Sequence, residues 1–364
     1  MLGIVWPSVR QTFHLTQEAA AVLLIAKFFS YFAGGFFSGR LCGVIGTGWV
    51  LVASAALMAL GLAGMAAASH WTVLVAASSV VGVGQGLLDG AVNIFAAARW
   101  SARWLNWLHA SFGVGSALTP ALTVTAMSAT GSWRGAYWMA AAPAVALCLL
   151  FWWTVRAWDV HAETQEVGVP LRSTLGLPAL WLFGGIFLMV SGIELTVGQW
   201  SYTLLTESRQ ISAAEAATWV SIYWGSFTAG RVLFGWVVER LPPPLLARIC
   251  TCVAAVGALM LHWRQTEFAG MVVLGFSLAP LYALWVARAG RQLGPLHAPN
   301  AIGILVAVSS IGLGILPALG GVVANRSLEW IPLFLFIQAL GLLLLSEIAG
   351  RVQILTNRPS SAAA

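Results

Sequence analysis

Long apolar stretches constrain this chain more than any other feature of its sequence. Each has close to the ~20 residues that a helix needs to cross the hydrocarbon core of a bilayer. A short apolar segment at 1–9 is followed by full-length stretches at 19–38, 47–68, 71–97, 104–128, 134–155, 178–204, 214–237, 244–263, 268–289, 299–323 and 330–348. Lipid offers no partner for backbone polar groups, so such stretches predict helices. We therefore expect an all-α membrane protein with eleven full transmembrane helices.

The composition agrees with a membrane protein and argues against an enzyme. Hydrophobic residues make up 59% of the chain and charged residues only 8%, whereas soluble domains carry about 25% charged residues. Cys250 and Cys252 have the wrong spacing for a redox or zinc motif, and no nucleophile triad or phosphate loop is present. We expect no catalytic residue, no cofactor and no metal. The net charge of +6 reports orientation in the membrane, so no nucleic-acid partner is expected.

Arginines are unevenly divided between the two sets of predicted loops. Eleven fall in one set: Arg40, Arg99, Arg103, Arg156, Arg172, Arg240, Arg248, Arg288, Arg291, Arg351 and Arg358. Five fall in the other: Arg10, Arg134, Arg209, Arg264 and Arg326. Short cytoplasmic loops are enriched in Lys and Arg, so the first set predicts the cytoplasmic side. We expect a multi-pass protein of the bacterial inner (plasma) membrane with its C-terminus in the cytoplasm. No cleavable signal peptide is expected, because a basic n-region is missing.

An internal repeat divides the chain into two halves. YFAGGFFSGR at 31–40 matches IYWGSFTAGR at 222–231, with the glycines and the Gly-Arg pair in register. We expect an N-terminal bundle over 1–156, a polar cytoplasmic linker over 157–176, and a C-terminal bundle with a short tail over 177–364. The repeat places the start of the first helix about a dozen residues before Met1, so a truncated first helix is expected. Repeats of this kind are typical of secondary transporters.

Polar residues inside one predicted helix mark the candidate site. Gln85, Asp89 and Asn93 are spaced i, i+4, i+8 and therefore stack on one helix face. A carboxylate at the centre of a membrane helix costs roughly 2.5–3.5 kcal/mol, so it is a functional hypothesis by default. His109, on the next helix, is expected at a depth similar to that of Asn93. The two either hydrogen-bond to each other or contact a substrate hydroxyl. The glycines in GVGQG at 82–86 allow close helix packing and are not a nucleotide motif.

These segments resemble the major facilitator superfamily. The features that carry the resemblance are the helix pattern, the central linker and SGRLCGVIGTG at 38–48, which is similar to the family's signature loop. In that loop Arg40 is kept, while Gly39 stands where the family usually has Asp. GVGQGLLDGAVN at 82–93, SWRGAY at 132–137 and GIELTVGQW at 192–200 resemble the fucose-permease-like branch of sugar–proton symporters. The resemblance implies the major facilitator fold, with two pseudo-symmetric helical bundles.

The resemblance also implies roles for the charged residues. The acid on the fourth helix of that branch couples transport to protons, and Asp89 stands there. Lys27 lies at a similar depth, so a structural ion pair with Asp89 is the alternative, and both can hold if Asp89 alternates between a proton and the ammonium group. Glu194 is a second candidate for proton coupling. Arg40 and Arg231 are expected to anchor the gate loops.

Several residues are expected to contact the substrate. They are Gln85, Asn93, His109, Gln199 and Trp200. A side-chain amide suits vicinal hydroxyls, whereas Trp200 is either a sugar-stacking residue or an ordinary interface anchor.

Together these features predict a secondary transporter, not an enzyme. It would move a small polar solute, a sugar or sugar derivative, by proton-coupled alternating access. Two alternatives remain: an exporter of drug-like or amphipathic metabolites in the same fold, and a non-transporting sensor or truncated remnant. The expected partners are the solute, protons and the lipid bilayer, and the expected assembly is a monomer.

Overall fold

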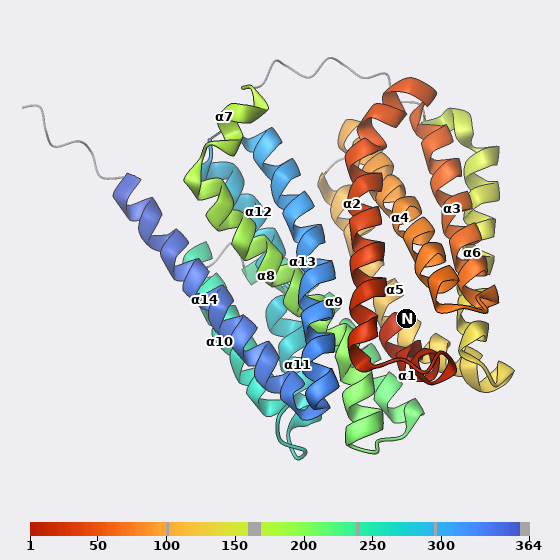
Figure 1. Ribbon diagram of the computed structural model, residues 1–364. Coiled ribbons are helices and arrows are strands. Elements are labelled where there is room, and N and C mark those ends of the chain that lie inside the picture. The colour runs from red at the N-terminus through yellow and green to blue at the C-terminus, as the bar shows by residue number, and fades with distance from the viewer. Residues whose placement is uncertain (100–101, 159–168, 238–240, 295–296, 357–364) are drawn as a thin grey trace, which may run out of the picture. The chain divides into compact units, whose positions relative to one another are not determined.

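Helices joined by short turns make up the structure (Figure 1). The computed structural model describes residues 1–99, 102–158, 169–237, 241–294 and 297–356. Within these ranges, nine helical segments are long and apolar enough to cross a membrane: Gln17–Ile45, Thr47–Ala67, Trp71–Ala96, Ser111–Thr130, Trp133–Trp153, Pro178–Ser208, Glu267–Ala289, Asn300–Arg326 and Leu328–Gly350. The all-helical membrane class is thereby confirmed.

The exact number of spans is not confirmed. The stretches expected at 214–237 and 244–263 form α9 (Ala213–Val237) and α10 (Pro243–Met260), and neither is among the nine segments. The apolar part of α10, Pro244–Met260, is shorter than the others. The first helix, α1 (Leu2–Thr12), has 11 residues and is too short to cross a bilayer.

The helices form two compact units. The first unit comprises Met1–Gln165, Leu195–Gly225 and Leu313–Ile331. The second comprises Glu166–Glu194, Ser226–Gly312 and Pro332–Ala364. Three helices are divided between the two units, namely α8 (Pro178–Thr203), α9 and α13 (Ala298–Arg326), and α14 (Ile331–Thr356) contributes its first residue to the first unit. The expected division into bundles at the 157–176 linker stays a prediction, and most of that linker, 159–168, lies outside the described residues.

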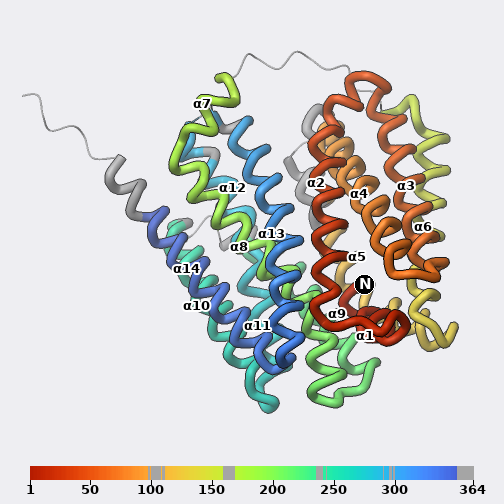
Figure 2. Tube along the Cα trace, viewed as in Figure 1, coloured from red at the N-terminus to blue at the C-terminus, as the bar shows by residue number. Residues whose placement is uncertain are grey.

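Four long helices form the core of the first unit. The helix α4 (Trp71–Arg99) packs against α2 (Ala20–Ile45) and α3 (Thr47–Ala67), and α3 packs against α6 (Trp133–Trp153) (Figure 2). Gly46 joins α2 to α3 with a φ of 87°, a conformation that glycine adopts without steric cost. The apolar cluster at these contacts consists of Val50, Leu51, Ala55, Leu87, Ala91 and Phe151.

Glycines bring α2 and α4 into close contact. A Cβ atom added at Gly82 or Gly86 would overlap the backbone carbonyl of Lys27 or Tyr31, respectively, and one added at Gly34 would overlap that of Val83. The glycine-rich sequence on α4 therefore packs directly against backbone, as small residues do at membrane helix interfaces. The close packing expected from GVGQG is confirmed, and it holds Asp89 of α4 near the side chains of α2.

The second unit contains the remaining long helices and one interrupted helix. Beside parts of α8, α9 and α13 it includes α7 (Leu171–Leu175), α10 and α14 (Ile331–Thr356). The segment around Pro280 divides one membrane-length stretch into α11 (Glu267–Leu278) and α12 (Leu281–Gln292). Ser191 of α8 and Ser309 of α13 share a hydrogen bond of 2.9 Å.

Candidate functional site

The polar face of α4 carries the expected stack of side chains. The Nδ2 atom of Asn93 donates to the backbone carbonyl of Asp89 at 2.8 Å and to its carboxylate Oδ1 at 3.1 Å. Helical spacing places the two residues one turn apart on the same face. Asp89 is exposed and Asn93 is half-buried, so the described residues of the first unit leave the Asp89 side chain accessible.

Tyr31 of α2 is the second partner of Asp89. Its hydroxyl donates to the carboxylate Oδ2 at 2.7 Å. The expected ion pair between Asp89 and Lys27 is not formed among the described residues; the Lys27 ammonium lies 5.7 Å from the centre of the Phe28 ring. In this conformation the contacts of the Asp89 carboxylate are therefore with neutral donors. Sequence reasoning missed Tyr31, although it lies one turn after Lys27.

Gln85 continues this face toward the other end of α4. It is half-buried, and its amide makes no hydrogen bond to any described residue. The side chain of His109, on α5 (Ala102–Thr130), lies outside the described residues, so the expected hydrogen bond between Asn93 and His109 is not tested. The amide nitrogen of Asn93 is engaged by Asp89.

Glu194 lies in the second unit, on α8. Its side chain is buried, with 9% of the residue exposed. Arg231 of α9 is close enough for its charge to attract the Glu194 carboxylate. The Arg231 guanidinium also stacks on the Phe227 ring at 4.4 Å. Arg231 thus contacts groups inside its own unit, while its expected role at a gate loop is not tested.

Gln199 and Trp200 are both buried in the first unit. Trp200 is 0% exposed, packs on Gly320 and donates its indole N–H to the carbonyl of Pro317 at 2.8 Å. This arrangement supports a packing role for Trp200, and in this conformation its ring is covered. Gln199 is 4% exposed, and its Nε2 atom has no hydrogen-bond partner among the described residues. A substrate contact by either residue stays a prediction.

Arg40, near the end of α2, is exposed and lines an apolar groove. The groove has a volume of about 450 Å³, and its walls include Phe37 and Val44 of α2 and Leu87 of α4. The expected anchoring of a gate loop by Arg40 is not tested by this contact.

A partly buried polar network joins α1 to the end of α8. There the helix widens into a π-helix, η3 (Leu204–Ser208), which contains Glu207. The Nη2 atom of Arg10 donates to both carboxylate oxygens of Glu207, at 2.9 and 3.0 Å. Gln17 donates to the same carboxylate at 2.8 Å and accepts the indole N–H of Trp6 at 2.8 Å. Sequence reasoning did not identify this network.

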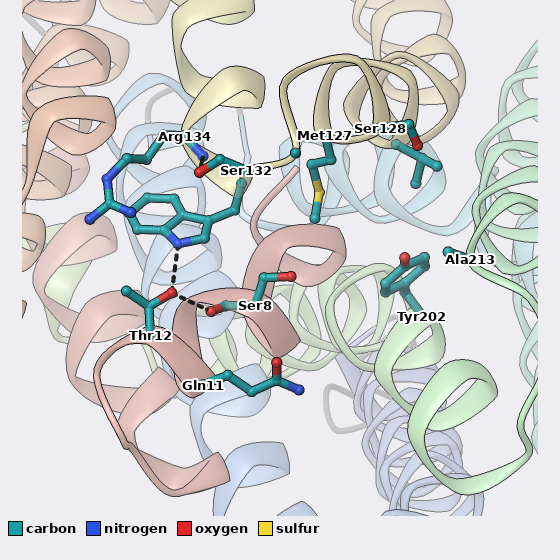
Figure 3. A pocket seen from close by; sticks show the side chains of 12 residues that line it. Ser8, Gln11, Thr12, Met127, Ser128, Ser132, Arg134, Tyr202 and Ala213 are labelled. Carbon is teal, nitrogen blue, oxygen red and sulfur yellow. Dashed lines mark hydrogen bonds between the residues drawn. The ribbon is translucent and has the colours of Figure 1, made fainter.

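A polar pocket lies beside this network in the first unit. Its volume is about 600 Å³, and α1, α5, α6 and α8 contribute to its walls. Figure 3 shows Ser8 and Gln11 of α1 pointing toward the space in front of Tyr202. Thr12, also in the wall, accepts the indole N–H of Trp133 at 2.9 Å. None of the α4 residues described above lines this pocket.

The all-helical membrane fold agrees with one protein family. A sequence model described as Major Facilitator Superfamily matches residues 1–266 and 182–360. The chain belongs to the Major Facilitator Superfamily. Both the family and the fold are those of transporters and not of enzymes, as the sequence predicted.

Two curated relatives are distantly similar to this superfamily member. Bypass of stop codon protein 6 of Saccharomyces cerevisiae is 23% identical over 48% of this chain, and the match spans 38% of that relative's length. Human sodium-dependent glucose transporter 1 is 22% identical over 79% of this chain, and the match spans 67% of that relative.

Solved structures of the superfamily share the fold over nearly the whole chain. A bacterial homologue of the human lysosomal transporter Spinster, in an inward-facing conformation, has a TM-score of 0.73 at 13% identity, covering 99% of this chain and 94% of that one. A D-xylose-proton symporter has a TM-score of 0.73 at 15% identity, covering 94% and 92%. The Escherichia coli fucose:proton symporter has a TM-score of 0.65 at 14% identity, covering 95% and 93%.

Proposed function

We propose that this chain moves a small polar solute, a sugar or sugar derivative, across the membrane by proton-coupled alternating access. The observation that carries the proposal is the contact of the Asp89 carboxylate with Tyr31 and Asn93 on an exposed face of a membrane-length helix. Both donors are neutral, so no fixed cation occupies the carboxylate in this conformation. Names of relatives support the solute class, since two of them refer to glucose and xylose.

Each polar residue has a place in this proposal. Asp89 binds the coupling proton, and Lys27 pairs with it in the conformation opposite to the one observed. Gln85 and Asn93 contact the solute from α4, with His109 and Gln199 as further contacts when the protein changes conformation, whereas Trp200 packs against α13. Glu194, which is buried in the second unit, is the second candidate for proton coupling.

The proposal includes a topology. Eleven full helices and the short α1 lie in a bacterial inner membrane, with the 157–176 linker and the C-terminus in the cytoplasm. Arg40 and Arg231 anchor the gate loops at that side, and the working unit is a monomer. A reporter fused after Ala364 should give a cytoplasmic signal, and a periplasmic signal would overturn this orientation.

Transport into liposomes tests the activity. Purified protein is reconstituted, and uptake of radiolabelled D-xylose, D-glucose and L-fucose is measured with an imposed proton gradient, with a sodium gradient and with neither. Proton-driven accumulation of one sugar, abolished by a protonophore, is the expected result. Accumulation with a sodium gradient alone would assign the coupling ion to sodium. The sodium gradient is included because the name of the human relative refers to sodium dependence.

The same preparation separates the alternative functions. An exporter of amphipathic compounds would be thermally stabilised by hydrophobic cations and not by sugars. A non-transporting protein would show neither accumulation nor exchange of any of these solutes. Either result would contradict the proposal.

A further inference from the structure

The polar pocket of the first unit contains hydrogen-bonding groups that the protein itself leaves unused. Four side chains in its wall make no hydrogen bond to any described residue: Ser8, Gln11, Ser128 and Tyr202. They come from α1, from the end of α5 and from α8, so they surround the space from different helices. Ser8 is half-buried and Gln11 and Ser128 are exposed, so their polar groups are accessible from the pocket.

Tyr202 is the most informative of the four. Only 5% of the residue is exposed, yet it lines the cavity. Buried tyrosine hydroxyls usually find a hydrogen-bond partner. In Figure 3 the Tyr202 hydroxyl points toward the space bounded by Met127 and Ser8. The hydroxyl of this largely buried side chain is thus accessible from the pocket, where a bound molecule can hydrogen-bond to it.

The other polar groups of the wall have partners within the protein, and the Arg134 guanidinium points away from Tyr202 (Figure 3). Arg134 donates to the carbonyl of Ala68 at 2.8 Å, and its guanidinium stacks on the Trp133 ring at 4.4 Å. Ser132 accepts the backbone N–H of Arg134. No carboxylate is among the residues that line the pocket in the described part of the chain. The unused groups are therefore neutral, and they both donate and accept hydrogen bonds.

We propose that this pocket is a second binding site, for a small neutral polyhydroxylated solute. The solute class rests on the proposed function, whereas the site is separate from the α4 face. Hydroxyls at Ser8, Ser128 and Tyr202 match ligand hydroxyls in both donor and acceptor roles, and the Gln11 amide suits a vicinal pair. Met127 supplies an apolar surface for the C–H groups of the ligand. The volume of about 600 Å³ falls within the usual range for small-molecule sites.

Protection from alkylation tests the site in the full-length protein. Ser128→Cys places a thiol in the wall, and its alkylation by N-ethylmaleimide is followed by peptide mass spectrometry, with D-glucose, D-xylose, L-fucose or sulfate present. Ala214→Cys is the matched control, because Ala214 is exposed next to the wall residue Ala213 but does not line the pocket. Ser8→Cys, on another wall, is a second reporter if Ser128→Cys does not fold.

The expected result is slower alkylation of the pocket thiol with at least one sugar, and unchanged alkylation of Ala214→Cys. Adding Tyr202→Phe or Gln11→Leu should weaken the protection about tenfold, the effect of one lost hydrogen bond of ~1.4 kcal/mol. Absence of protection by all three sugars, equal slowing at both positions, or protection by sulfate alone would each overturn the proposal.

Transport and protection can fail separately. Protection of the pocket thiol by a sugar in a protein that has Asp89 intact, but takes up none of the three sugars under any gradient, would keep the pocket and reject the proposed transport. Proton-driven uptake of a sugar that leaves the pocket thiol unprotected would keep the transport and reject the pocket.

Discussion

The hydroxyl of Tyr31 donates a hydrogen bond of 2.7 Å to the carboxylate of Asp89 across the contact between α2 and α4. The glycines of α4 make this contact possible, because Gly86 packs on the Tyr31 backbone itself. A neutral donor thus occupies the position next to Asp89 that sequence reasoning assigned to Lys27. If Asp89 couples transport to protons, its function therefore depends on the position of α2, which carries Tyr31.

Removal of the Tyr31 hydroxyl should slow transport while leaving the fold intact. Tyr31→Phe deletes one hydrogen bond to a carboxylate, worth about 1.5 kcal/mol or more, so proton-driven uptake should fall about tenfold. Because Asp89 is exposed, water can replace the lost donor and the melting temperature should change little. The control is Tyr137→Phe, since the buried Tyr137 hydroxyl has no hydrogen-bond partner among the described residues. Equal uptake by Tyr31→Phe and Tyr137→Phe would contradict a role for Tyr31.

The glycine contact between α2 and α4 should tolerate no added methyl group. In Gly86→Ala the new Cβ would overlap backbone atoms of Tyr31 and Gly35, and overpacking of this kind costs about 1–3 kcal/mol. We expect a lower melting temperature in detergent together with slower uptake. Gly43→Ala, on α2 itself, places its Cβ where no atom lies within 4 Å and should be neutral. The same melting temperature for both variants would show that the close contact is unimportant.

The Glu207 network should stabilise the first unit. Glu207→Ala removes the partner of both Arg10 and Gln17, and loss of hydrogen bonds to a charged group costs about 1.5–3 kcal/mol. Glu207→Gln keeps a hydrogen-bonding side chain and should lose less stability. Glu215→Ala, at an exposed position of α9, is the control. Thermal unfolding measures all three, and no difference between Glu207→Ala and Glu215→Ala would contradict this role.

Trp200 should matter for stability more than for solute affinity. Trp200→Phe leaves the buried carbonyl of Pro317 without its indole donor, which costs about 1–3 kcal/mol. The melting temperature should fall while the KM for the transported sugar stays the same. A large rise in KM with an unchanged melting temperature would instead restore Trp200 as a sugar contact.

Helical periodicity allowed part of the site to be predicted. The spacing of Asp89 and Asn93 fixes their common face on any straight α-helix, and the structure has them hydrogen-bonded. Glycines at 82, 84 and 86 likewise indicated close packing, because small residues allow the backbones of two membrane helices to approach each other.

Contacts between helices could not be predicted in the same way. Rise per residue gives the depth of Lys27 but not its direction around the α2 axis, so Tyr31 was overlooked as the partner of Asp89. Trp200 faces Pro317, and that contact depends on where α13 lies. Glu207 lies within a π-helical turn, which changes the angular spacing of side chains and moves its carboxylate away from the face that a regular helix predicts.

Uptake by Asp89→Asn in liposomes tests the coupling mechanism most directly. Asparagine keeps the size of the side chain but cannot carry the proton. We predict that the variant loses accumulation driven by a proton gradient and retains exchange of labelled for unlabelled sugar at equal concentrations, with the melting temperature of the wild type. Accumulation to the wild-type level in Asp89→Asn would contradict the assignment of Asp89 as the proton-coupling residue.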